Sequence, residues 1–132
     1  MSKQSVFLSY SSRDRDAAAR FEEALERLGL EAFNPVRELQ AGEDWRKSIQ
    51  AAIKRSHALI VLMTTPQSGE SSWMAYEAGV AEALGKPIMV LLPSKYPVAE
   101  LPADVAAGQV LDFDPKAPEG AAREIVHRLV PA

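Results

Sequence analysis

The stretch Ala58-Leu59-Ile60-Val61-Leu62-Met63 decides the fold of this chain. Its six residues are all apolar and lack the alternation of a half-exposed strand, so the strand is predicted to be covered on both faces. Strands of this kind are typical of parallel sheets that carry helices on either side. The stretch therefore predicts the central strand of an α/β domain.

The segments on either side of this strand alternate between strands and helices. Apolar runs predict four further strands, at residues 6–10, 30–33, 87–92 and 109–111. Apolar residues that recur every three or four positions predict helices at residues 15–28, from 43–44 through Ile53, at 71–84 and at 119–130. This alternation predicts a doubly wound, five-stranded parallel sheet with helices on both faces and right-handed crossovers.

Length and composition exclude several classes of protein. With 132 residues, of which 47% are hydrophobic and 25% charged, residues 1–132 are expected to form one folded domain, complete or cut from a longer protein. A net charge of −3 argues against binding to nucleic acid or to anionic membranes. The chain has no cysteine, and its polar start lacks a signal-peptide core, so a cytoplasmic location is expected.

In sheets of this class, ligands bind beyond the carboxyl ends of the strands. Three segments reach that edge in this sequence: the serine-rich turn after the first strand, the loop at 34–43 and the loop at 64–72. No GxxxxGK[ST] or GxGxxG pattern is present, so a classical nucleotide hydrolase or dehydrogenase is not expected. His57 and His127 are isolated in the sequence, and no metal site is predicted around them.

The helix predicted at 71–84 carries an acid next to its apolar face. At about 100° per residue, five of its residues gather on the face predicted to look into the core. They are Trp73, Tyr76, Val80, Ala83 and Leu84. Glu77 lies at the edge of this face. It either marks the boundary with water or is a desolvated functional carboxyl with a raised pKa.

A desolvated acid, aromatic side chains, small hydroxyls and helix amino ends suit cleavage of an N-glycosidic bond that has a good leaving group. In that chemistry Glu77 would stabilise an oxocarbenium-like centre or hold the ribose hydroxyls. Trp73 would either stack on a ring of the substrate or fill the core.

Four segments resemble motifs of Toll/interleukin-1 receptor (TIR) domains, in order and with compatible spacings over about residues 5–112. The first-strand motif is resembled by Phe7-Leu8-Ser9-Tyr10-Ser11, and the loop that leads into the second helix by Leu39-Gln40-Ala41-Gly42-Glu43-Asp44-Trp45. The glutamate motif of TIR domains that consume NAD is resembled by Ser72-Trp73-x-x-x-Glu77, and the entry to the fourth strand by Gly85-Lys86-Pro87-Ile88.

The resemblance implies a flavodoxin-like TIR fold and, by its glutamate motif, a bacterial-type domain that cleaves NAD+ to nicotinamide and ADP-ribose or a cyclic form. NAD+ is then the substrate, and no cofactor is implied. Carried over by position, Glu77 would be the catalytic acid. The implied substrate-binding residues are Tyr10, Ser11, Ser12, Phe33, Asn34, Arg37 and Trp73.

One departure from the family concerns the phosphates. Some enzymes of the family have basic residues just after the first-strand motif, where this chain has Ser11 and Ser12. Arg37 is then either a substitute phosphate contact or a solvated loop charge.

The resemblance also implies partners. Active members typically self-assemble, and the family's assembly loop corresponds to residues 34–43, with Pro35, Leu39 and Gly42. A fused or separate sensor domain and a role in bacterial antiphage defence are further implications.

Two other interpretations stay open. The first is a non-enzymatic TIR module that binds other TIR domains through residues 34–43, whatever residue stands at position 77. The second is a nucleoside deoxyribosyltransferase, because residues 77–87 also resemble the helix that carries the nucleophilic glutamate of those enzymes. The first-strand motif and Trp45 favour a TIR domain over the transferase.

Overall fold

A computed structural model describes residues 4–10, 12–33, 45–64, 71–97, 101, 105 and 108–129, with the backbone alone at 12, 33, 45–46 and 71–75. Five strands form one parallel sheet in the order β2-β1-β3-β4-β5. The strands are β1 (Ser5–Tyr10), β2 (Glu31–Phe33), β3 (Ala58–Leu62), β4 (Ile88–Leu92) and β5 (Gln109–Asp112). The predicted doubly wound sheet is confirmed, and β3, formed by the unbroken apolar run, is its central strand.

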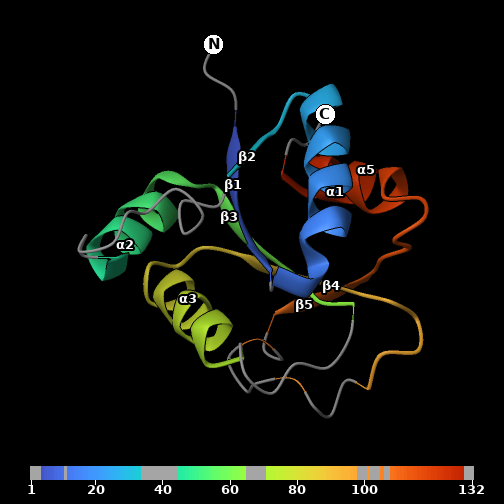
Figure 1. The fold of residues 1–132 in the computed structure, drawn as a ribbon. Helices are drawn as coiled ribbons and strands as arrows, with labels where there is room; N and C mark the ends of the chain where they lie inside the picture. Colours follow the sequence, from blue (N-terminus) through green and yellow to red (C-terminus); the bar gives the residue numbers. More distant parts are fainter. Residues whose placement is uncertain are drawn as a thin grey trace.

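The helices cover the sheet in two pairs, as Figure 1 shows. On one face lie α1 (Arg15–Arg27) and α5 (Glu119–Leu129), and on the other lie α2 (Trp45–Arg55) and α3 (Ser71–Ala83). A short 3-10 turn, η1 (Ser12–Asp14), joins β1 to α1. Within the described ranges no helix is long and apolar enough to cross a membrane.

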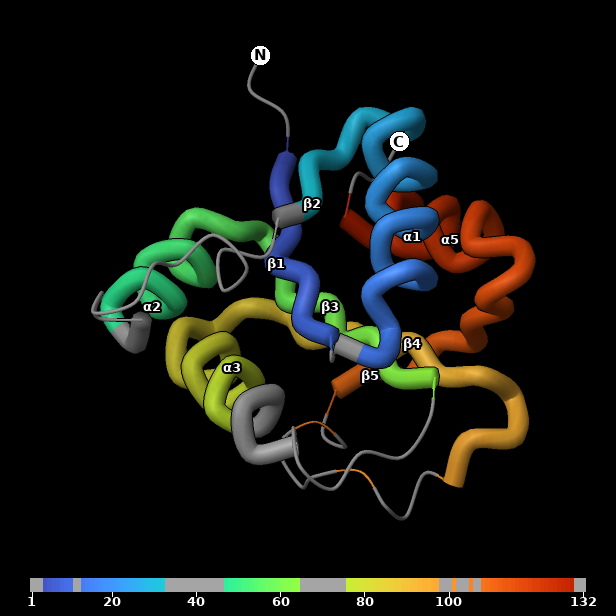
Figure 2. The backbone as a smooth tube through the Cα atoms, viewed as in Figure 1, coloured from blue at the N-terminus to red at the C-terminus, as the bar shows by residue number. Residues whose placement is uncertain are grey.

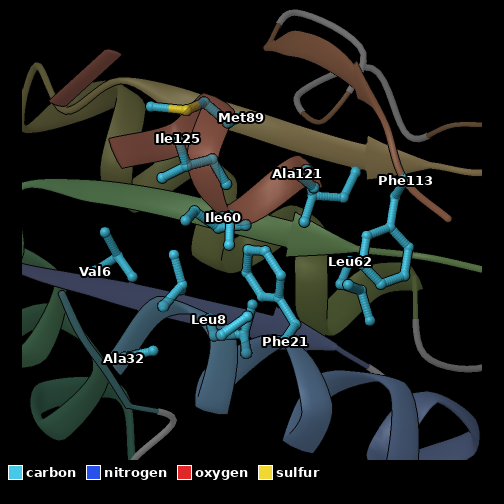
Figure 3. Close-up of a cluster of buried hydrophobic side chains, with 14 of the residues drawn as sticks. Val6, Leu8, Phe21, Ala32, Ile60, Leu62, Met89, Phe113, Ala121 and Ile125 are labelled. Carbon is cyan, nitrogen blue, oxygen red and sulfur yellow. The ribbon is translucent and has the colours of Figure 1, made fainter. Parts of the chain in front are cut away.

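Each face of the sheet has its own apolar core. Figure 3 shows the α1/α5 side, where Phe21 of α1 meets Phe113 edge-on, with ring centroids 5.9 Å apart. On the α2/α3 side, the buried side chains come from the alternate positions of the same strands. They include Phe7, Ile49, Ile53, Leu59, Val61 and Val90. Three residues of α2 at helical spacing, Ile49, Ala52 and Ile53, are fully buried against this face.

Alternation along β1 decides which side chains face which pair of helices. Val6 and Leu8 belong to the α1/α5 core, and half-buried Tyr10 packs against it. Phe7 belongs to the α2/α3 core. Because successive residues of a strand point to opposite faces, Ser9 shares the face of Phe7.

The face that α3 turns to the sheet differs from the predicted one. Ala78 and Ala81 are fully buried, as is Glu77 itself, whereas Ala83 is exposed and Leu84 keeps 42% of its surface. The buried face is therefore rotated by about 100°, the step of one residue along a helix. Small alanines let the helix axis approach the sheet closely, and Tyr76 and Val80 then pack at its side. Glu77 lies within the buried face and not at its edge.

Candidate functional site

A buried polar contact joins β1 to α3 at the carboxyl end of the sheet. The Ser9 hydroxyl donates a hydrogen bond of 2.5 Å to Oε1 of Glu77. Both residues have no exposed surface. Ser9 is in register with Val61 of the central strand β3, so the contact lies near the middle of the sheet. This is the edge where ligands bind in open parallel sheets.

The surroundings of Glu77 act on its pKa in two opposite ways. Full burial disfavours the ionised carboxylate, whereas the hydrogen bond from Ser9 favours it. Glu77 shares its buried helix face with Ala78 and Ala81, which belong to the apolar α2/α3 core. A carboxylate held in this way interacts more strongly with a nearby positive charge than one in water. The raised pKa expected from the sequence stays a prediction.

A second buried carboxyl ties together the turns that follow β1 and β3. Asp14, at the end of η1, is 2% exposed. It accepts hydrogen bonds from the backbone N–H of Thr64, at 3.2 Å, and from the Thr64 hydroxyl. Asp14 occupies the N-cap position of α1 but makes no side-chain cap bond. Its carboxylate therefore serves a long-range contact and not the start of the helix.

The structure separates two of the predicted site residues. Tyr10 packs against the α1/α5 core, on the opposite face of the sheet from Glu77. The strand residue brought to Glu77 is Ser9, which was not among the predicted site residues. The sequence does contain a sign of this role. Ser9 is a polar side chain inside a buried strand, on the same face as Phe7.

The side chains of the other predicted site residues lie outside the described part of the structure. Ser12, Phe33 and Trp73 are placed by their backbone only, at the start of η1, at the end of β2 and in the first turn of α3. Six further positions fall outside the described ranges: Ser11, Asn34, Pro35, Arg37, Leu39 and Gly42. Their roles stay predictions.

In the described ranges, no three or more histidine, aspartate or glutamate side chains are grouped so that they could hold a metal ion. His57 has a structural partner, since its Nδ1 accepts a hydrogen bond of 3.1 Å from the Ser5 backbone N–H.

Fold and site together define a flavodoxin-like α/β domain with a buried acid at the ligand-binding edge of its sheet. The TIR-domain family model matches residues 6–128. The chain therefore belongs to the TIR-domain family. The search of curated proteins finds no match.

Solved structures share this fold. The TIR domain of a Toll-related receptor from Hydra magnipapillata is similar, with a TM-score of 0.66 and 23% identity over 94% of this chain and 96% of that one. A 2-deoxyribosyltransferase from Bacillus psychrosaccharolyticus has a TM-score of 0.63 and 19% identity, over 87% of this chain and 90% of its own. A Clostridium botulinum CMP N-glycosidase has a TM-score of 0.58 and 22% identity, over 92% of this chain and 98% of its own. At these identities the likeness concerns the fold alone.

Proposed function

We propose that this TIR domain hydrolyses NAD+ at the bond between nicotinamide and ribose, with Glu77 as the catalytic acid. The observation that carries the proposal is the hydrogen bond of 2.5 Å between Ser9 and Glu77, both fully buried at the ligand-binding edge of the sheet. Fully buried carboxyls are uncommon in proteins, and titratable groups in such settings cluster at functional sites.

The reaction needs little beyond a well-placed carboxylate. The C1′–N bond breaks, its electron pair passes to the pyridinium nitrogen, and nicotinamide leaves as a neutral molecule. The positive charge that develops on the ribose is stabilised by the Glu77 carboxylate, held by the Ser9 hydroxyl. A water molecule then adds to C1′ and gives up a proton, which yields ADP-ribose. Attack by an adenine nitrogen in place of water would give a cyclic product.

Two enzymes with a similar fold support this choice of chemistry. A 2-deoxyribosyltransferase and a CMP N-glycosidase both act on the bond between a sugar and a base. The resemblance of Ser72-Trp73-x-x-x-Glu77 to the glutamate motif of NAD-consuming TIR domains points to NAD+ as the substrate. The proposal includes a role in bacterial immune defence.

The burial of Glu77 sets a condition on this activity. A side chain with no exposed surface cannot contact a substrate until neighbouring segments move. The resemblance to active TIR domains, which typically self-assemble, leads us to propose that assembly of several copies supplies this movement, and we expect the isolated chain to be slow.

Complete burial also favours a second candidate, a non-enzymatic TIR module in which Glu77 is only an anchor between β1 and α3. That candidate predicts no NAD+ turnover at any protein concentration. The transferase alternative is favoured by the likeness to the 2-deoxyribosyltransferase fold. It predicts that a free base exchanges into a deoxynucleoside while NAD+ stays intact.

One set of incubations separates the three candidates. The protein is supplied dilute, concentrated, or clustered on a surface, with NAD+ or with a deoxynucleoside plus a free base, and the products are separated by chromatography. Release of nicotinamide that rises with clustering supports the proposal. Base exchange without loss of NAD+ supports the transferase. An unchanged mixture in every arm supports the interaction module.

A further inference from the structure

Asp14 is a buried carboxylate that the proposed chemistry does not use. It is 2% exposed, and both of its oxygens accept hydrogen bonds from one residue, Thr64. The Thr64 backbone N–H donates to Oδ2 at 3.2 Å, and the Thr64 hydroxyl donates to Oδ1. Two donors from a single residue fix its backbone and its side chain together. The contact therefore sets where the chain leaves β3.

The N–H that Asp14 binds lies where β3 loses its neighbour β1. The N–H of Met63 donates to the carbonyl of Leu91 in β4. Because successive N–H groups of a strand point to opposite neighbours, the next one, from Thr64, points to the β1 side. However, β1 ends at Tyr10, and the chain turns there toward α1. The Asp14 carboxylate takes the place of the next β1 carbonyl and closes the end of the seam between the two strands.

This seam is the point where the winding of the sheet reverses. In the order β2-β1-β3-β4-β5, the chain leaves β1 for α1 on one face and continues from β3 to α3 on the other. Figure 2 shows the start of α1 beside the end of β3, with α3 on the opposite side of the sheet. Ligands of open parallel sheets bind in the crevice that opens at such a reversal. Asp14 bridges the two strand exits that border this crevice.

Buried carboxyls lie on both faces of the sheet at this reversal. Glu77 is bonded to Ser9 on the α2/α3 side. The Asp14 contact lies on the α1/α5 side, because Thr64 follows Leu62 by two residues and Leu62 belongs to that core. The two acids therefore have different tasks. Glu77 is the proposed catalytic group, and Asp14 holds the chain beside it.

We propose that Asp14 is a positioning residue of the nucleotide site, which acts through Thr64 by fixing the exits of β1 and β3 and so the shape of the crevice between them. The inference rests on the proposed function for the identity of the nucleotide. Losing the contact widens or shifts the crevice and weakens nucleotide binding. It leaves the bond between Ser9 and Glu77 in place, so the chemical step is kept.

The test measures binding and turnover separately, on clustered protein. The variants are Thr64→Val, which removes the hydroxyl donor, and Asp14→Asn, which replaces one acceptor oxygen by an amide. We expect the KM for NAD+ and the Kd for ADP-ribose, from calorimetry, to rise by at least about tenfold in both variants. The kcat should stay within about threefold of the wild type, because only binding is weakened. Thr64→Ser keeps the donor and should restore both constants.

Two controls separate positioning from a general loss of stability. Asp16→Asn makes the same chemical change at an exposed acid of α1 and should keep the wild-type constants. Gly108→Ala should lose stability, because its Cβ would lie 2.8 Å from Ile88 Cγ2, at the start of β5 and away from the crevice. It should also keep the wild-type KM and Kd. Circular dichroism checks that every variant is folded at the assay temperature.

The two readouts distinguish this inference from the proposed hydrolysis. Unchanged binding in Thr64→Val and Asp14→Asn, or an equal loss in Gly108→Ala, would overturn the role of Asp14 even if NAD+ is hydrolysed. A wild type that binds ADP-ribose but leaves NAD+ intact would contradict the hydrolysis, and the binding constants would still decide the role of Asp14. A wild type that binds no ADP-ribose would overturn the inference.

Discussion

The Ser9 hydroxyl and the Glu77 carboxylate lie 2.5 Å apart, although 68 residues separate them in the sequence. This bond connects the strand next to the centre of the sheet with the helix that carries the only buried glutamate in the described ranges. It gives Glu77 a fixed orientation in an apolar setting.

Removing the Ser9 hydroxyl should destabilise the domain. Ser9→Ala leaves a buried carboxyl oxygen without this donor, and we expect a loss of about 1–3 kcal/mol in the free energy of unfolding. Urea denaturation measures it, with Ser94→Ala as the control at an exposed serine. In a double-mutant cycle with Glu77→Leu, which removes the acceptor, the two effects should fail to add by more than about 0.5 kcal/mol. Additive effects would show that the bond contributes nothing.

The contact between Asp14 and Thr64 gives a second stability prediction. Thr64→Val keeps the size of the side chain but removes one of the two donors to a buried carboxylate, so we expect a cost of about 1–3 kcal/mol. Thr64→Ser keeps the donor and should cost less. Asp16→Ala, at an exposed acid of α1, should change stability by less than about 0.5 kcal/mol. Equal effects of Thr64→Val and Asp16→Ala would contradict the contact.

Which face α3 turns inward can be tested with two alanines. Ala81 is fully buried against the sheet, so Ala81→Leu should overfill the core and cost about 1–3 kcal/mol. Ala83 is exposed, and Ala83→Leu should be nearly neutral. Thermal or urea unfolding of the two variants compares them directly. The reverse order of stability would restore the face expected from the sequence.

The sheet itself was predictable from the sequence because its signal is local. The unbroken apolar run of β3 and the alternation of elements define a parallel sheet covered on both faces. The face of α3 was not predictable in the same way. That helix is apolar on nearly all sides, so its periodicity does not identify one buried face. The small alanines that pack against the sheet also contribute little to a hydrophobic pattern.

The candidate site was predictable only in part. Glu77 stood out because an acid is rare among aromatic and aliphatic neighbours. Its partner Ser9 depends on how β1 and α3 meet across the sheet, and so does the separation of Tyr10 onto the other face. The partnership of Asp14 and Thr64, 50 residues apart, is likewise a product of the strand order β2-β1-β3.

A pair of glycines tests the packing of the sheet edge. A Cβ at Gly108 would lie 2.8 Å from Ile88 Cγ2 and 2.9 Å from the Ile88 carbonyl oxygen, so Gly108→Ala must displace β4 or β5. We expect it to cost about 1–3 kcal/mol. Nothing lies within 4 Å of a Cβ at Gly120, in the first turn of α5, and Gly120→Ala should stabilise the helix by about 0.5–1 kcal/mol. A stabilising Gly108→Ala would contradict the packing.

The central claim is that Glu77 acts as the catalytic group on NAD+, and one comparison tests it most directly. Nicotinamide release is measured for the clustered wild type, for Glu77→Gln and for Glu82→Gln, an equivalent change at an exposed position of the same helix. The account predicts wild-type rates for Glu82→Gln and a loss of at least about 100-fold for Glu77→Gln, with both variants folded. Equal turnover in the two variants, or none in the wild type, would contradict it.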